Sequence, residues 1–163
     1  MKINIALLDQ EAGACQSFRF ACPIETIDEH NTASWIEGNV EVEGKVCNTG
    51  ACLALTGEIH AKANRVCHRC LKEFSAAIVT SFSENWQQAD GDSEVIRYQG
   101  DELDISELVR ESLVLAEPLK NLCSEMCRGL CPTCGADLNH AKCNCVRDEI
   151  DPRLAALQKL LEK

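Results

Sequence analysis

Six cysteines lie close together near the carboxyl end of the chain, and this cluster constrains the fold more than any other feature. The segment reads CSEMCRGLCPTCGADLNHAKCNC, and its cysteines are Cys123, Cys127, Cys131, Cys134, Cys143 and Cys145. The segment is too short and too polar to build a hydrophobic core of its own. Thiolates that bind a metal ion order such segments, because the free energy of metal binding becomes free energy of folding.

The motif Cys131-Pro-Thr-Cys134-Gly is the centre of this module. Two thiolates separated by two residues can face one tetrahedral ion, about 2.3 Å from each sulfur. Gly135 permits a positive φ, which lets backbone amides approach the sulfurs. We expect the other ligands to be Cys123 or Cys127 on one side and Cys143 or Cys145 on the other. The pattern predicts a structural Zn²⁺ site closed by four thiolates.

Two other interpretations of the cysteines remain open. An iron–sulfur cluster also takes four thiolates, but its usual spacings, C-x2-C-x2-C and C-x4-C-x2-C, do not occur here. A second C-x2-C motif, Cys67-His-Arg-Cys70, makes eight thiols available. We favour one ion, with two ions of four thiolates each as the alternative. Cys67 and Cys70 also form a candidate redox pair, although a thioredoxin-type pair follows a parallel strand and these surroundings indicate antiparallel strands.

The charge of the chain argues against broad contact with nucleic acid. The net charge is −10 and the pI about 4.8, so the overall field repels phosphate backbones. One stretch departs from this balance, since it holds four cations and a single neighbouring anion, Glu73. These cations, Lys62, Arg65, Arg69 and Lys72, are the candidate contacts for RNA, with ordinary solvated surface charge as the alternative.

The sequence indicates a soluble, cytoplasmic protein that is not an enzyme. The first residues lack the apolar stretch of a signal peptide, and no window reaches the 18 apolar residues of a membrane span. Without an oxidising compartment a disulfide framework is disfavoured, and Cys15, Cys22, Cys47 and Cys52 receive no role. The four histidines are scattered, and no group of residues indicates catalysis or a small-molecule substrate.

Hydrophobic patterning predicts an α+β fold with a mainly antiparallel sheet. Strands are expected at 2–8, 40–47, 51–60, 74–82 and 95–98, with a hairpin turn at 48–50 and a possible bulge at Gly44. Residues 10–35 show no clear pattern. A helix is expected at about 104–116, with Asp104 as N-cap, Glu107 completing a capping box, and a mostly apolar stripe that includes Val109 and Leu113. A last helix should begin at Asp151-Pro152. We expect a sheet domain over 1–119 and a zinc-binding module with the last helix over 120–163.

Several of these motifs, taken in order, resemble the YceD-like family of proteins linked to accumulation of large-subunit ribosomal RNA. They are CHRCLKEF (67–74), DISELVRESLVLAEPL (104–119), LCSEMCRGLCPTCGADLN (122–139), CNC (143–145) and IDPRLAAL (150–157). The resemblance covers about residues 38–161. Some members of the family lack the carboxyl-terminal cysteines, so the resemblance does not make the metal module a requirement of family function.

The resemblance implies a factor that helps to make or mature the large ribosomal subunit. Its expected partner is precursor large-subunit ribosomal RNA or a basic large-subunit ribosomal protein, and the acidic charge fits a chaperone of such a protein. A thiol oxidoreductase that uses Cys67 and Cys70 is the alternative from a different class of function. The sequence leaves the oligomeric state open.

Overall fold

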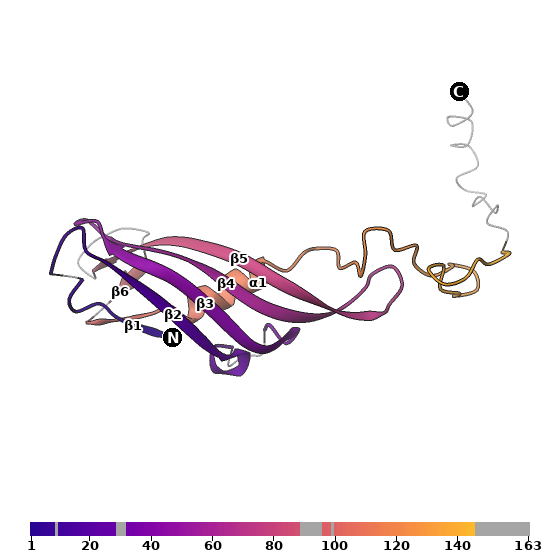
Figure 1. Ribbon diagram of the computed structural model, residues 1–163, viewed down its shortest axis with the longest axis horizontal. Helices are drawn as coiled ribbons and strands as arrows, with labels where there is room; N and C mark the ends of the chain where they lie inside the picture. Colours follow the sequence, from indigo (N-terminus) through magenta and orange to yellow (C-terminus); the bar gives the residue numbers. More distant parts are fainter. Residues whose placement is uncertain (9, 29–31, 89–95, 99, 146–163) are drawn as a thin grey trace, which may run out of the picture.

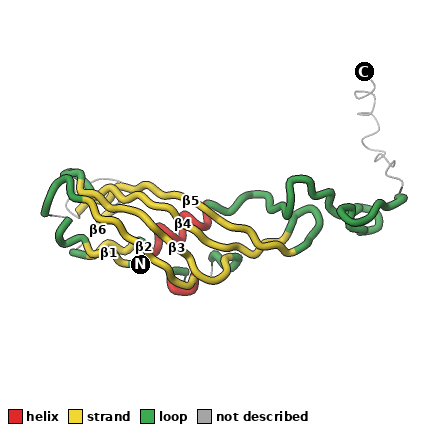
Figure 2. The backbone as a smooth tube through the Cα atoms, viewed as in Figure 1, coloured by secondary structure: helices red, strands yellow, loops and turns green. Residues whose placement is uncertain are grey.

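The computed structural model describes residues 1–8, 10–28, 32–88, 96–98 and 100–145. Its elements are β1 (Lys2–Asn4), β2 (Cys15–Pro23), the 3-10 helix η1 (Ile24–Thr26), β3 (Ile36–Asn48), β4 (Leu53–Val66), β5 (Glu73–Gln88), β6 (Ile96–Tyr98), β7 (Glu102–Asp104) and α1 (Ser106–Leu115). Figures 1 and 2 show a long sheet that continues at one end into irregular structure, residues 117–145, which we call the arm. The predicted α+β class with a mainly antiparallel sheet is confirmed, and the expected helix after Asp151 lies outside the described residues.

The main sheet has the order β2-β3-β4-β5-β6, and only the β5–β6 pair is parallel. The predicted hairpin at 48–50 is confirmed as the connection between β3 and β4, with Gly50 at φ 86°. β3 is longer than expected at both ends, and β5 continues to Gln88, beyond the expected end at residue 82. Residues 95–98 were expected as a short strand, and β6 confirms it over Ile96–Tyr98.

Near the amino terminus one expectation was wrong, and one segment without a prediction is structured. The expected first strand ends at Asn4, and β1 pairs with β7 in a small separate sheet. Residues 10–35, which showed no clear pattern, contain η1 and the edge strand β2. In β2, Phe18, Phe20 and Cys22 pack against the core while the residues between them are exposed.

Gly44 is not a bulge. It pairs in regular register with Phe18 of β2 and with Gly57 of β4, and the irregularity in β3 lies between Glu37 and Glu41. Gly38, between those two residues, has a φ of +74°, which a glycine adopts without strain.

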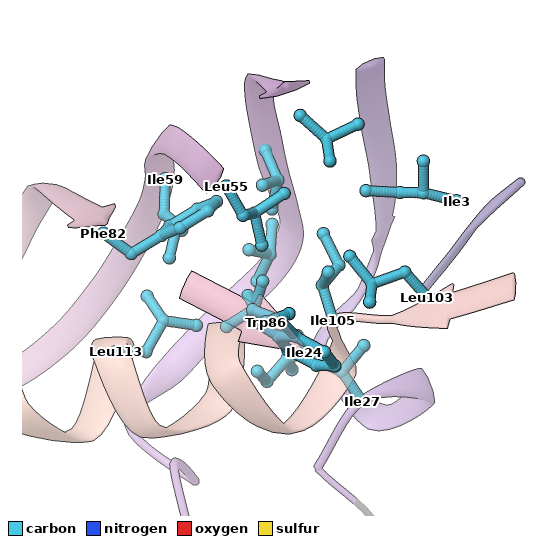
Figure 3. Close-up of a cluster of buried hydrophobic side chains, with 14 of the residues drawn as sticks. Ile3, Ile24, Ile27, Leu55, Ile59, Phe82, Trp86, Leu103, Ile105 and Leu113 are labelled. Atoms are coloured by element: carbon cyan, nitrogen blue, oxygen red, sulfur yellow. The ribbon is translucent and has the colours of Figure 1, made fainter. Parts of the chain in front are cut away.

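One face of the main sheet is covered and forms the core. α1 packs on this face with Val109 and Leu113, as the predicted apolar stripe requires. Ile24 and Ile27 near η1 and Ile3 and Leu103 of the small sheet join the same cluster (Figure 3). The opposite face of the sheet carries mostly polar and small side chains. In the described part of the chain, no helix is long and apolar enough to cross a membrane.

The start of α1 differs from the predicted capping box. The residue before the helix is Ile105, whose backbone N–H donates to the carbonyl of Met1 and whose side chain makes no capping hydrogen bond. Asp104 lies at the end of β7, where its carboxylate accepts from the backbone N–H of Ser106 and lies 3.3 Å from the amino terminus. Glu107 forms an ion pair with Arg110. Asp104 therefore pairs with Lys2 in the small sheet and lies one residue before the N-cap position, while its carboxylate still accepts from the first N–H of the helix.

Candidate metal centres

The first group of thiols joins two parts of the chain that are far apart in sequence. Cys67 and Cys70 lie in the turn between β4 and β5, and Cys123 and Cys127 lie in the arm that follows α1. The Sγ atoms of Cys67 and Cys127 are 3.8 Å apart, and those of Cys70 and Cys123 are 3.6 Å apart. Four sulfurs around a tetrahedral ion at 2.3 Å are separated by about 3.8 Å. The spacing therefore fits a tetrahedral metal ion, with all four Sγ atoms within 4.8 Å of one another.

The arm is fixed to the turn between β4 and β5 by hydrogen bonds on both sides of the cysteines. The backbone N–H of His68 donates to the carbonyl of Asn121 at 2.8 Å, and that of Leu130 donates to the carbonyl of Arg69 at 3.0 Å. Gly129, at φ +75°, lies against Arg69, since a Cβ there would be 2.8 Å from the Arg69 carbonyl oxygen. These contacts bring Cys123 and Cys127 to Cys67 and Cys70.

Arg69 adds side-chain contacts to this junction. Its Nη1 donates to the carbonyl of Cys127 at 2.7 Å and to that of Glu125 at 3.2 Å. Hydrogen bonds from a charged donor are the stronger kind, so they restrain the backbone that presents the Cys127 thiol.

Backbone amides prepare one thiol of this group for metal binding. Hydrogen bonds from backbone N–H groups, the strongest from Cys123, lower the pKa of the Cys67 thiol to about 6, although burial opposes them. The pKa of Cys123 is raised to about 12, first by its hydrogen bond with Cys70 and then by burial. The thiolate, and not the thiol, binds a metal ion. Metal binding therefore releases a proton from each cysteine that is still protonated at neutral pH.

The second group of thiols lies entirely within the arm and comprises Cys131, Cys134, Cys143 and Cys145. The Cys131 N–H donates to the carbonyl of Ala136 at 2.8 Å, and the Gly135 N–H donates back to the carbonyl of Cys131 at 2.9 Å. Gly135 has a φ of +72°, as the sequence predicted. The backbone N–H groups of Cys134 and Thr133 lower the pKa of Cys131 to about 6. The pKa of Cys145 is raised to about 12, chiefly by its hydrogen bond with Cys134.

One side chain connects the two groups. Asn139 lies in the loop between Cys134 and Cys143, yet its Nδ2 donates to the Cys127 sulfur of the first group at 3.5 Å. Its Oδ1 accepts from the backbone N–H of Arg128 at 2.8 Å. A backbone hydrogen bond from Leu138 to Gly129, 2.9 Å long, runs beside these contacts. The role of Asn139 could not be predicted, because nothing in the local sequence pattern marks a contact to a sulfur outside its own loop.

The structure divides the cysteines differently from the sequence-based expectation. Cys123 and Cys127 lie with Cys67 and Cys70, and not with Cys131 and Cys134. The reason is that the β4–β5 turn supplies the second pair of sulfurs, which the local spacing of the arm does not reveal. Two groups of four thiols match the two-ion alternative better than the favoured single ion, and the number of ions bound stays a prediction.

The structure does not gather the four predicted RNA contacts into one patch. Lys62 is exposed on the open face of β4, whereas the guanidinium of Arg65 lies over the ring of Trp35, 5.4 Å from its centroid. Arg69 is engaged with the arm, and Lys72 is exposed immediately before β5. Two of the four cations are therefore committed to contacts within the protein.

The four remaining cysteines lie outside both groups. Cys15 of β2 and Cys47 of β3 are cross-strand partners and form a disulfide on the open face of the sheet. The described residues thus contain one disulfide, although the sequence argued against a framework of them. Cys22 and Cys52 are free and half-buried.

Comparison with known proteins gives a family match over the segment that contains both groups. The family model described as large ribosomal RNA subunit accumulation protein YceD matches residues 55–161. A protein from Arabidopsis thaliana, named large ribosomal RNA subunit accumulation protein YCED homolog 1, chloroplastic, is 39% identical over 62 residues, which are 38% of this chain and 19% of that protein.

A second relative comes from Bacillus subtilis (strain 168). Its name is uncharacterized protein YlbN, and it is 36% identical over 73 residues, which are 44% of this chain and 42% of that protein. The chain thus matches about a fifth and about two fifths of the length of these relatives. No solved structure matches.

Proposed function

Since the chain belongs to the YceD family of large ribosomal RNA subunit accumulation proteins, we propose that it supports accumulation or maturation of large-subunit ribosomal RNA as a non-enzymatic factor. We further propose that it binds Zn²⁺ at both groups of four thiols. The observation that carries this proposal is that the family-matched segment contains eight cysteines in two closed groups.

The donor set favours a structural role for the metal. Four thiolates around one ion leave no position for a water or a substrate, and catalytic zinc sites keep such a position open. An ion in the first group would hold the arm on the β4–β5 turn, and an ion in the second would order the loop around it. The two thiols whose pKa is lowered to about 6, Cys67 and Cys131, each belong to one of these groups, as the thiolate form of a metal ligand requires.

Two partners are compatible with this role. Precursor large-subunit ribosomal RNA is the partner that the family description supports most directly. A basic large-subunit ribosomal protein is the second candidate, because the net charge is −10 and because Arg65 and Arg69 are engaged within the chain. A basic protein would bind to the acidic sheet domain, and this complex would survive treatment with nuclease.

The redox alternative receives less support from the geometry. A dithiol that exchanges with substrates needs an accessible sulfur, whereas Cys67 is fully buried and Cys70 is 8% exposed. Both thiols also lie against Cys123 and Cys127, which makes them part of a group of four. We propose the cytoplasm as the place of action, since free thiols persist there. The Cys15–Cys47 disulfide argues against this location, because disulfides are rare in the cytoplasm.

Two measurements test the proposal. Metal analysis of the purified chain should give two zinc ions per chain, and Cys67→Ser with Cys70→Ser should reduce this ratio to one. The matched control is Cys52→Ser, which removes a half-buried thiol outside both groups. A ratio that never exceeds one would overturn the two-site assignment.

The second measurement concerns ribosomal RNA. Cells that lack the protein should accumulate less mature large-subunit RNA than cells that carry it, with small-subunit RNA as the internal control. Capture of the metal-loaded chain from lysate, with and without nuclease, then separates an RNA partner from a protein partner. Unchanged large-subunit RNA in the depleted cells would contradict the proposed function.

A further inference from the structure

The outer side of β5 is a long strand edge that no described strand covers. β4 pairs with β5 from Glu73 to Trp86, and on the other side β6 reaches only the last three residues, Trp86 to Gln88. Figure 1 shows β5 as the outer margin of the sheet along most of its length. In the described part of the chain, residues 74–84 have no backbone hydrogen bond to the arm or to α1.

This edge lacks the features that normally keep strand edges from pairing. Charged residues, proline, bulges and short strands protect the edges of natural sheets. Residues 74–83, FSAAIVTSFS, contain no charge, no proline and no glycine. The opposite edge, β2, has Arg19 at its centre, Pro23 at its end and a disulfide to β3. The contrast indicates that the β5 edge is kept available for pairing.

The sequence of β5 is complementary to itself when two copies run antiparallel with Ile78 at the centre. Phe74 then faces Phe82 of the other copy, and Ala76 faces Thr80, all on the face that forms the core. On the open face, Ser75 faces Ser81 and Ala77 faces Val79, whose side chain is 60% exposed. Aromatic cross-strand pairs such as Phe74–Phe82 stabilise a sheet.

The charges that flank the strand match in the same register. Lys72 precedes β5 and Glu84 lies near its far end, so each lies opposite the other across a two-fold axis at Ile78. The pair occurs twice in a symmetric dimer. Other antiparallel registers lose this match; centring on Thr80, for example, places Ala76 opposite Glu84.

We propose that the β5 edge pairs with the same edge of a second copy of this chain, antiparallel and centred on Ile78. The two five-stranded sheets then form one continuous sheet with an isologous interface. α1 packs against β5. Three apolar side chains in α1 and the arm are exposed: Leu115, the last residue of α1, and Met126 at 85% each, and Leu119 fully. The Lys72–Glu84 match favours a second copy over a strand from a basic protein, since residues 74–83 offer no anion to such a strand.

The experiment combines mass measurement with charge reversal. Light scattering after size exclusion, over a range of concentrations, should show a dimer for the metal-loaded chain. Lys72→Glu and Glu84→Lys should each raise the dimer dissociation constant about tenfold, because each turns two attractions into two repulsions. The double variant should return to within about threefold of the original value. Lys120→Glu is the control, since it makes the same charge change on the arm.

A cross-link fixes the register. A carbodiimide joins an amine to a carboxylate without a spacer, and Lys72 and Glu84 of one strand are about 40 Å apart. Mixed copies with light and heavy nitrogen should therefore give a cross-linked Lys72–Glu84 peptide that contains both isotopes. A chain that is monomeric at its highest soluble concentration overturns the proposal, and so does a dimer that ignores both charge reversals and gives no such peptide.

Discussion

The guanidinium of Arg69 donates a 2.7 Å hydrogen bond to the carbonyl of Cys127, 58 residues later in the chain. Through this contact the turn between β4 and β5 holds the backbone of one of its own prospective metal ligands. The first thiol group is therefore assembled by tertiary contacts, whereas the second forms within one segment of the arm.

Arg69→Ala should weaken zinc binding at the first group and leave the second unchanged. The substitution removes hydrogen bonds to the carbonyls of Cys127 and Glu125, and bonds from charged donors contribute about 1.5–3 kcal/mol each. Because water can replace Arg69 as the hydrogen-bond donor to both carbonyls, we expect the affinity of the first group for zinc to fall about tenfold. Competition with a chromophoric chelator measures this affinity. Arg128→Ala is the matched control, since the hydrogen bond of Arg128 to Asn139 uses its backbone. Equal losses in the two variants would contradict a specific role for Arg69.

Asn139→Ala should also weaken the first group, although Asn139 lies in the loop of the second. Its amide donates to the Cys127 sulfur and holds the backbone of Arg128, and groups that orient metal ligands typically contribute tenfold or more in affinity. Chelator competition should show about a tenfold loss at the first group. His140→Ala, one residue later and exposed, should cause none. A loss confined to the second group would mean that Asn139 acts only within its own loop.

The sequence predicted the elements whose signals are local. Asn48-Thr49-Gly50 between two alternating runs marks the β3–β4 hairpin, and Val109 and Leu113 mark the buried stripe of α1. Strand β2 had a usable signal as well, since Phe18, Phe20 and Cys22 alternate with polar or small residues. It was missed because an edge strand packs only half of its side chains, and the flanking polar residues concealed a short pattern.

The division of the cysteines could not be predicted from spacing. Cys70 and Cys123 are 53 residues apart, and only the path of the arm back to the β4–β5 turn brings their sulfurs within 3.6 Å. The same applies to Arg65 and Arg69. They are four residues apart in the sequence. Arg65, at the end of β4, lies over Trp35, whereas Arg69, in the β4–β5 turn, contacts the arm. Two of the four cations in this run therefore contact the protein itself, which the spacing in the sequence did not reveal.

Gly57→Ala should destabilise the sheet, because the backbone at this point has no room for a side chain. Gly57 pairs with Gly44, and a Cβ on Gly57 would lie 2.8 Å from the Glu43 carbonyl oxygen and within 3.0 Å of the Phe82 ring. The Phe18 and Phe82 rings occupy the space that these glycines leave, an arrangement known to support glycines in sheets. We expect a loss of about 1–3 kcal/mol in the free energy of unfolding, measured with denaturant and tryptophan fluorescence. Ser83→Ala, an exposed change beside Phe82, should alter it by less than about 0.5 kcal/mol.

Asp28→Asn should destabilise the fold at neutral pH and progressively less in acid. Burial alone would raise the pKa of the Asp28 carboxyl, but hydrogen bonds from the Ala33 N–H and the Thr32 hydroxyl, with Arg110 nearby, hold it below its usual value. A carboxyl with a lowered native pKa contributes stability above its unfolded pKa, near 4, and loses that contribution as the pH falls through the native value. Asn keeps one acceptor oxygen where the carboxylate uses two, so we expect a cost of about 1–3 kcal/mol at pH 7.

Urea unfolding of the original and variant chains from pH 7 down to pH 3, followed by the fluorescence of Trp35 and Trp86, checks this expectation. Both tryptophans lie in the sheet domain, so the signal reports the region around Asp28 and not the loss of metal from the arm in acid. Glu37→Gln, which removes an exposed carboxylate from β3, should show no comparable difference between neutral and acid pH. A cost for Asp28→Asn that is constant with pH would show that the Asp28 charge does not stabilise the fold and that shape alone accounts for the effect.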